Sequence, residues 1–151
     1  MSYADVVGFT EISQRVSPSD LVGLLELVFG TIDSLANEYP RIMMLHTVGD
    51  AYVAVSGLVG TGVEREKQST ADRVSEMIRF SEGIVGRLKP MSYATSDGEE
   101  IDVKVRIGIA NSYLMGGLVG SWNICFNIPY IVRCIAAIVC ALYTVYTCWC
   151  K

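Results

Sequence analysis

Cysteine is absent from the first 124 residues of this 151-residue chain, and all five cysteines lie in its last 27 residues. The chain also opens without the basic and apolar stretches that make up a secretory signal peptide. An odd number of cysteines without such a signal argues against a fold held together by disulfides. We therefore expect residues 1–111 to form an intracellular domain.

Charged side chains are scarce at the other end of the chain. Of the 28 Asp, Glu, Lys and Arg residues, only Arg133 and Lys151 lie beyond Asn111, so residues 1–111 carry 10 basic and 16 acidic side chains, a net charge of −6. They contain no basic stripe, so nucleic-acid binding is not expected. A chain of this length forms one domain with a sizeable core.

The apolar pattern of residues 1–111 predicts four strands, two long helices and one short helical turn. The expected strands, which are apolar and rich in β-branched residues, are Ser2–Val7, Ile42–Thr47, Ala51–Ser56 and Val103–Ala110. The expected helices, which show helical spacing of apolar residues, are Phe9–Ser13, Pro18–Ala36 and about Lys67–Leu88.

Local signals place the start of the first long helix. Ser17 can act as its N-cap, Pro18 fits the first helical position, and Asp20 is the third position of a capping box. Residues 90–100 are polar, with Asp97-Gly98 as a turn signal, and are expected to form a flexible loop. The order of elements predicts an α+β, ferredoxin-like βαββαβ fold, an antiparallel sheet with helices on one face.

Two aspartates mark a candidate site for chemistry. Asp5 ends the first strand just before a helical start, and Asp50 lies in the turn between the second and third strands. The first and third strands are neighbours in this fold, so the two carboxylates can meet and hold Mg²⁺ that bridges a nucleoside triphosphate. Backbone N–H groups after Val7 would then face phosphate oxygens at a helix N-terminus. The alternative on spacing alone is that Asp5 is a capping residue and Asp50 an ordinary turn residue.

Three blocks of the chain resemble the class III adenylyl and guanylyl (nucleotidyl) cyclase catalytic domain. They are Ala4–Thr10 (ADVVGFT), Thr47–Gly57 (TVGDAYVAVSG), and Arg106–Ile109 with Gly116–Gly120. The resemblance implies conversion of ATP or GTP to a 3′,5′-cyclic nucleotide and pyrophosphate with two Mg²⁺ or Mn²⁺ ions. It also implies a head-to-tail dimer whose sites are built from both protomers. Residues 1–120 are expected to be a partial catalytic domain, incomplete at both ends.

The resemblance implies roles for individual residues. Those implied are the metal ligands Asp5, Asp50 and the Val6 carbonyl, and the triphosphate contacts Phe9 and Thr10. His46 falls where the family places the purine-reading lysine (for ATP) or glutamate (for GTP). Because histidine can donate or accept a hydrogen bond, it does not choose a base, and the alternative is an ordinary strand residue.

The last segment, residues 121–151, departs from the family pattern. Asn123 and Arg133 are present, but neither lies in the motif that supplies the family's transition-state Asn and Arg. Residues 134–150 carry no charge, yet 17 residues are marginal for a spanning helix of about 20. The alternatives for the tail are a membrane helix at 134–150, a buried segment, or non-family sequence that does not fold, for example from a wrong exon junction or a frameshift in the gene model. We expect a cytoplasmic domain, held at the cytoplasmic face of a membrane if the tail is an anchor.

Two other functions remain open on the sequence. One is a catalytically incomplete half-site that binds metal–nucleotide or pairs with a complementary cyclase protomer, because the metal motifs are present while much of the purine and transition-state set is not. The other is a membrane-tethered interaction domain.

Overall fold

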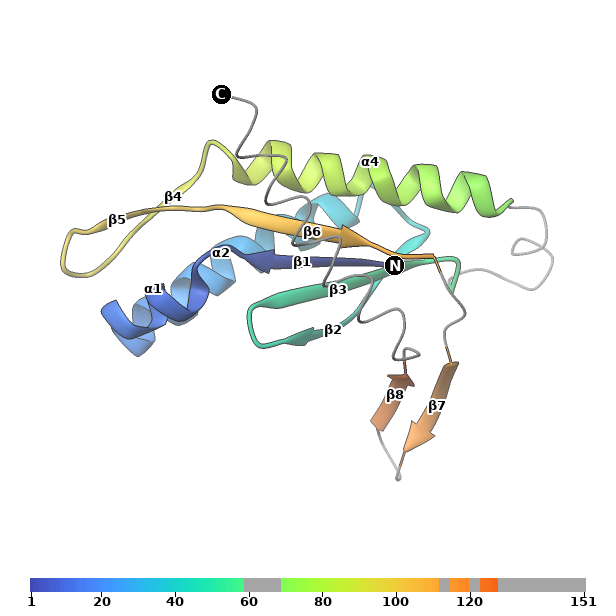
Figure 1. Ribbon diagram of the computed structural model, residues 1–151, viewed down its shortest axis with the longest axis horizontal. Helices are drawn as coiled ribbons and strands as arrows, with labels where there is room; N and C mark the ends of the chain where they lie inside the picture. The colour runs from blue at the N-terminus through green and yellow to red at the C-terminus, as the bar shows by residue number, and fades with distance from the viewer. Residues whose placement is uncertain (59–68, 112–114, 120–122, 128–151) are drawn as a thin grey trace.

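The computed structural model describes residues 1–58, 69–111, 115–119 and 123–127 (Figure 1). Its strands are β1 (Ser2–Val6), β2 (Ile42–Val48), β3 (Ala51–Ser56), β4 (Ser92–Ala94), β5 (Glu100–Asp102), β6 (Val105–Ile109), β7 (Met115–Val119) and β8 (Asn123–Asn127). Its helices are α1 (Phe9–Arg15), α2 (Pro18–Ala36) and α4 (Thr70–Leu88). The predicted strands and helices are therefore present, with ends that differ by at most three residues.

The main sheet has four antiparallel strands in the order β2-β3-β1-β6. The first strand therefore lies inside the sheet, flanked by β3 and β6, and β6 forms one edge. This order is that of the ferredoxin-like βαββαβ fold, and the predicted fold class is confirmed.

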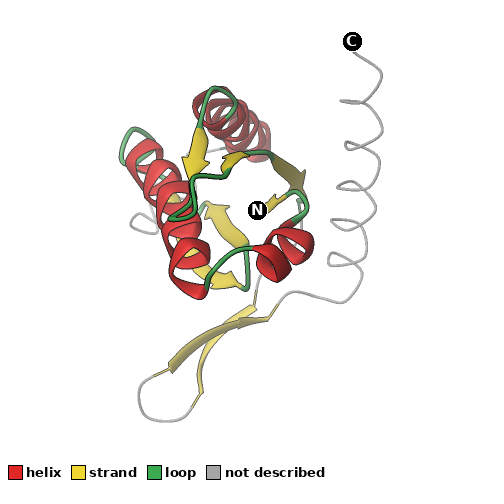
Figure 2. Ribbon diagram, turned by 90° about the vertical axis from the view of Figure 1, so that its left-hand side faces the viewer, coloured by secondary structure: helices red, strands yellow, loops and turns green. Residues whose placement is uncertain are grey.

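Both long helices cover the same face of this sheet, and they lie next to one another beside the strands (Figure 2). Strand residues that alternate along β1, β3 and β6 point to that face, as the period of two in a strand requires. They join the apolar sides of α2 and α4 in one core, which includes Ala4, Tyr52, Ile107, Val28, Ile32, Phe80 and Ile84. Burial of these side chains supplies the main driving force for the fold.

The starts of the long helices carry the caps that their sequences predict or permit. The Ser17 hydroxyl accepts a hydrogen bond from the Asp20 backbone N–H at 3.2 Å, and Pro18 occupies the first helical position. At α4, Ser69 and Asp72 form a reciprocal capping box. Each cap satisfies backbone donors that have no partner inside the helix.

The expectation of a flexible loop at residues 90–100 is wrong, because β4 and β5 pair there as a hairpin. Packing of its side chains fixes this hairpin on the rest of the domain. Ile101 is buried, and Tyr93 packs so closely on α2 that a Cβ added to Gly23 would fall 2.2 Å from its hydroxyl oxygen. The polar turn is anchored as well, since Ser96 donates two hydrogen bonds to the buried carboxylate of Asp20.

Beyond the main sheet, β7 and β8 form a separate antiparallel pair. The membrane helix predicted at residues 134–150 lies outside the described residues. Within the described ranges, no helix combines the length and hydropathy that crossing a bilayer requires.

Candidate metal and nucleotide site

Asp5 and Asp50 are brought to one end of the main sheet by strand register. Asp5, near the end of β1, lies directly opposite Ala51, the first residue of β3 and the neighbour of Asp50. The carboxyl group of Asp50 lies within hydrogen-bond reach of the Asp5 carboxyl. The two side chains that the sequence singled out are therefore neighbours in space, although 45 positions separate them in the chain.

A two-residue turn presents Asp50. Val48 pairs with Ala51, so Gly49 and Asp50 alone connect the two strands. Gly49 has φ of 62°, in the left-handed region that glycine reaches without steric cost. Glycine at the first central position is typical of tight hairpin turns that match the twist of their strands. The geometry of the turn therefore explains why glycine occupies position 49. It also leaves the Asp50 side chain near the end of β1.

Crowding of the two carboxyls changes the proton affinity of Asp50. Burial raises the pKa of Asp50 to about 6, and the hydrogen bond to Asp5 and the negative charge of Asp5 add to the rise. The backbone N–H groups of Asp50 and Val6 oppose it. Asp5, Val6 and Asp50, the three predicted metal ligands, are thus grouped, and the negative charge of Asp5 disfavours ionisation of Asp50.

Arg106 of β6 is a member of this group that sequence reasoning missed. It lies opposite Asp5 in the register of β1 with β6. Its Nε donates a hydrogen bond to Asp5 Oδ2 at 2.6 Å, and its Nη2 contacts the same oxygen. The alternation of side chains along a strand predicts that Arg106 points away from the helices. Its contact with Asp5 could not be predicted, because it depends on the pairing of two strands whose residues are 101 positions apart in the chain.

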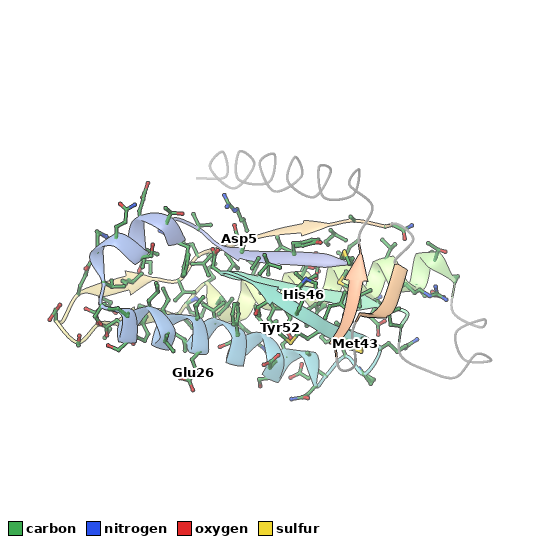
Figure 3. The ribbon with its side chains drawn as sticks, turned by 90° about the horizontal axis from the view of Figure 1, so that it is seen from below. Asp5, Glu26, Met43, His46 and Tyr52 are labelled. Atoms are coloured by element: carbon green, nitrogen blue, oxygen red, sulfur yellow. The ribbon has the colours of Figure 1, made fainter. Side chains whose placement is uncertain are left out.

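The hairpin that carries Asp50 is tied to the helix layer by Tyr52 (Figure 3). The Tyr52 side chain is buried, and its hydroxyl donates to Asp33 Oδ1 of α2 at 2.6 Å. Burial, with the hydrogen bond to Asp33 and the charge of Asp33, raises the pKa of Tyr52 above its ordinary value. The hydroxyl therefore remains a donor at neutral pH and fixes β3 on α2.

The predicted triphosphate contacts lie at the start of α1, just after the last residue of β1. Gly8, with φ of 74°, is the N-cap, and its carbonyl accepts hydrogen bonds from Glu11 and Ile12. The Phe9 side chain packs against the core, whereas Thr10 is exposed. The first N–H groups of a helix have no partner inside it, so the backbone of this turn can donate to an anion.

His46 lies on β2 (Figure 3). A β-bulge in the register of β2 with β3 decides which face of the sheet it shares. Met44 pairs with Ala54 and His46 pairs with Val53, so Leu45 is the extra residue. Without the bulge, His46 would pair with Tyr52 and point toward the helices, because one residue of slip reverses every side chain of a strand. With it, His46 shares the face of Asp5. Strand spacings put the Cα atoms of these two residues about 12 Å apart.

This donor set suits a hard divalent cation that completes its coordination with substrate. Mg²⁺ takes oxygen ligands and is commonly held by one or two carboxylates together with phosphates, rather than by a full protein cage. Among the described residues, no group of three or more His, Cys, Asp or Glu side chains is arranged to hold a metal ion. Two crowded carboxyls beside the Val6 backbone fit that requirement.

Comparison with known proteins places these residues in a family. A sequence model described as "Adenylate and Guanylate cyclase catalytic domain" matches residues 1–128. The chain is 36% identical over 118 residues to "Guanylyl cyclase, membrane" of Dictyostelium discoideum, which covers 78% of this chain and 7% of that protein. It is 26% identical over 126 residues to an adenylate cyclase of Mycobacterium bovis, covering 83% of this chain and 26% of that one. The chain thus spans only a small part of these relatives.

A solved structure shares the fold. The crystal structure of the guanylate cyclase domain of RhGC from Catenaria anguillulae, in complex with GTP, superposes with a TM-score of 0.69 at 24% identity. The match covers 89% of this chain and 68% of that one.

Proposed function

Because the chain belongs to the adenylate and guanylate cyclase catalytic domain family, we propose that it is a nucleotidyl cyclase domain that converts ATP or GTP to a 3′,5′-cyclic nucleotide and pyrophosphate. The single observation that carries the proposal is the meeting of the Asp5 and Asp50 carboxyls at one end of the sheet. In this reaction the ribose 3′-oxygen bonds to the α-phosphorus as its proton passes to water, and the bond from that phosphorus to the bridging oxygen of the departing pyrophosphate breaks.

Each grouped residue has a part in this proposal. Asp5, Asp50 and the Val6 carbonyl would hold two Mg²⁺ or Mn²⁺ ions, which when bound supply charge stabilisation at the α-phosphate and favour ionisation of the 3′-hydroxyl. The backbone at Phe9 and Thr10 would donate to the triphosphate, since the Phe9 ring is engaged in the core. The chain's contribution is thus to position substrate and to concentrate negative charge where cations are needed.

The base of the substrate would lie toward His46. This residue shares the face of Asp5 and lies two strands away, a span that matches a nucleotide bound with its phosphates at the aspartates. Histidine can accept or donate a hydrogen bond, so either purine can be read there. Assays with ATP and with GTP, on the wild type and on His46→Lys and His46→Glu variants, would assign the base: lysine should favour ATP and glutamate GTP.

The experiment that tests the function is Mn²⁺-dependent production of cAMP or cGMP by the purified chain and by its Asp5→Ala variant. Asp102→Ala is the matched control, because this exposed aspartate of β5 pairs with Lys104 and lies outside the site. Loss of activity in Asp5→Ala with retention in Asp102→Ala supports the assignment. Equal activity of both variants and the wild type would refute it.

A half-site role is the second candidate, favoured by the extent of the family match. The match ends at residue 128, and the grouped carboxyls of Asp5 and Asp50 would supply the metal side of a cyclase site. In a head-to-tail dimer, a partner protomer would then contribute the purine and transition-state residues. Mixing the chain with a protomer that carries those residues tests this role: activity of the mixture that neither chain shows alone supports it, and a silent mixture counts against it.

We further propose that the domain acts on the cytoplasmic side of a membrane. The support is the relative named a membrane guanylyl cyclase and the charge-free run at residues 134–150. Partition of the whole chain into detergent, compared with a chain ending at residue 128, tests this location. Recovery of both forms in the aqueous phase would contradict the anchor.

A further inference from the structure

Arg106 holds Asp5 by a two-donor contact on a single oxygen. Its Nε lies 2.6 Å from Asp5 Oδ2, and its Nη2 contacts that same atom. The Asp5 side chain is only 20% exposed, while that of Arg106 is 45% exposed. Two N–H donors from one rigid guanidinium hold this oxygen in place and offset its negative charge.

The other charges near this pair are acidic or directed elsewhere. Asp50 lies within hydrogen-bond reach of Asp5 and adds a second carboxyl to the same corner. Lys104, two residues before Arg106 in the chain, is 69% exposed and pairs with Asp102 at 3.6 Å. Arg106 is therefore the cation that the described contacts place on the two-aspartate group.

A divalent cation that binds Asp5 through Oδ2 competes with the guanidinium for the same oxygen. Mg²⁺ binds carboxylate oxygens at about 2.0–2.1 Å in a nearly octahedral arrangement. An oxygen that already accepts two N–H donors has no lone pair turned toward such a cation, and the two positive groups repel each other at close range. Binding of the cation through this oxygen consequently requires the Arg106 fork to move off it.

We propose that Arg106 is a positioning residue that serves as an internal counter-ion of the metal site: it holds Asp5 Oδ2 before a divalent cation binds and is displaced from that oxygen when one does. The proposal rests on the metal-ligand assignment made under the proposed function. It predicts that Arg106 holds Asp5 in place before a cation binds and, by competing for Asp5, sets the cation concentration at which half of the sites bind one.

The test is the affinity of the full chain for Mn²⁺ alone, measured by the paramagnetic resonance signal of free Mn²⁺. Arg106→Gln should bind Mn²⁺ about fivefold more tightly than the wild type, an effect of the size expected for a partly exposed ion pair. Lys104→Gln removes the same charge from a neighbouring position without touching Asp5, so its affinity should stay within about twofold of the wild type.

Three outcomes would overturn the proposal: unchanged or weaker binding in Arg106→Gln, an equal gain in Lys104→Gln, or a gain that persists when Asp5→Asn is combined with Arg106→Gln. If Arg106→Gln does not fold, Arg106→Lys carries the test, because it keeps the charge but loses the fork and should gain about twofold. Its failure to gain would equally refute the proposal.

The same titrations separate this proposal from the function on which it rests. If Asp5→Ala binds Mn²⁺ as well as the wild type, the assignment of the metal ligand is wrong, and both proposals fail. If Asp5→Ala loses Mn²⁺ while Arg106→Gln gains nothing, the metal site stands, and only the counter-ion role of Arg106 fails.

Discussion

Two carboxyl groups of this domain have opposite surroundings. At the start of α2, the Asp20 carboxylate accepts hydrogen bonds from the Ser17 hydroxyl and from the hydroxyl and backbone N–H of Ser96. At the β2–β3 turn, the Asp50 carboxyl instead lies beside a second carboxyl, that of Asp5. Hydrogen bonds from Ser17 and then from Ser96 lower the pKa of Asp20. Burial and Asp5 raise the pKa of Asp50 to about 6.

The difference separates a carboxylate used for structure from one suited to a ligand. The chain satisfies Asp20 with its own donors, and the result is a link between α2 and the β4–β5 turn. At the other corner the chain brings two carboxyls together. Arg106 pairs with Asp5, yet the negative charge of Asp5 still raises the pKa of Asp50, an arrangement that a bound cation would relieve. Perturbed proton affinity in such a pair is typical of functional sites.

The largest expected effect comes from removing one charge of the pair. Asp50→Asn should weaken Mn²⁺ binding by at least about tenfold, because the site then has one carboxylate for a divalent cation. Asp20→Asn, the same change in the structural region, should leave Mn²⁺ affinity unaltered. Isothermal titration of both variants with Mn²⁺ measures the contrast, and equal losses would show that the two regions do not differ in the way described.

Thermal stability should show the opposite contrast, because it should depend on the structural carboxylate of Asp20. Asp20→Ala removes the partner of three donors and should lower the melting temperature by roughly 5 °C. Asp97→Ala, in the same β4–β5 turn but exposed, should change it by no more than about 1 °C. Thermal unfolding followed by circular dichroism gives both numbers, and an unaltered melting point in Asp20→Ala would mean that the Ser96 contacts contribute nothing to the fold.

The hydrogen bond from Tyr52 to Asp33 fixes the hairpin that carries Asp50 on α2, and it can be removed while the aromatic ring is kept. Tyr52→Phe loses the hydrogen bond to Asp33 and should lower the free energy of unfolding by about 1 kcal/mol, since exposed Asp33 can turn to water. Tyr39→Phe keeps its edge contact with Phe80 and should cost less than about 0.5 kcal/mol. Urea denaturation compares them, and equal costs would deny Tyr52 its anchoring role.

The smallest effect is the pH dependence of Asp50. Its pKa is higher in the folded chain, about 6, than its ordinary value of 3.8, so its stabilising contribution is complete below pH 3.8 and is lost as pH rises through 6. Asp50→Asn should therefore be more stable than the wild type at pH 7.5, by about 1 kcal/mol because solvent screens part of the repulsion. The gain should fade toward pH 4. Denaturant unfolding across this range tests it, and a gain independent of pH would contradict the raised pKa.

Much of the fold could be predicted because its signals are local. Ser17 and Pro18 mark the start of α2, apolar spacing marks both long helices, and Gly49-Asp50 marks a hairpin between two β-rich runs. The β4–β5 hairpin was missed, since its turn residues are polar and its support comes from Asp20 and Gly23 on a distant helix.

The candidate site could be predicted only in part. Asp5 and Asp50 were expected to meet because the order of elements makes β1 and β3 neighbours, and that juxtaposition is present. Their roles in metal binding, with those of Val6, Phe9, Thr10 and His46, stay predictions. Arg106 was not assigned a role, because its contact with Asp5 joins strands at opposite ends of the described core.

The sequence by itself therefore determined the family, the order of the elements and the identity of the two acidic residues, since each depends on short motifs or on periodicity within one segment. Only the tertiary structure decided that Arg106 holds Asp5 and that a bulge at Leu45 turns His46 to the face of the aspartates. The first depends on the register between two strands that are far apart in the chain. The second depends on one extra residue in the pairing of β2 with β3. Register is set by packing of the whole sheet against α2 and α4, and no single segment encodes it.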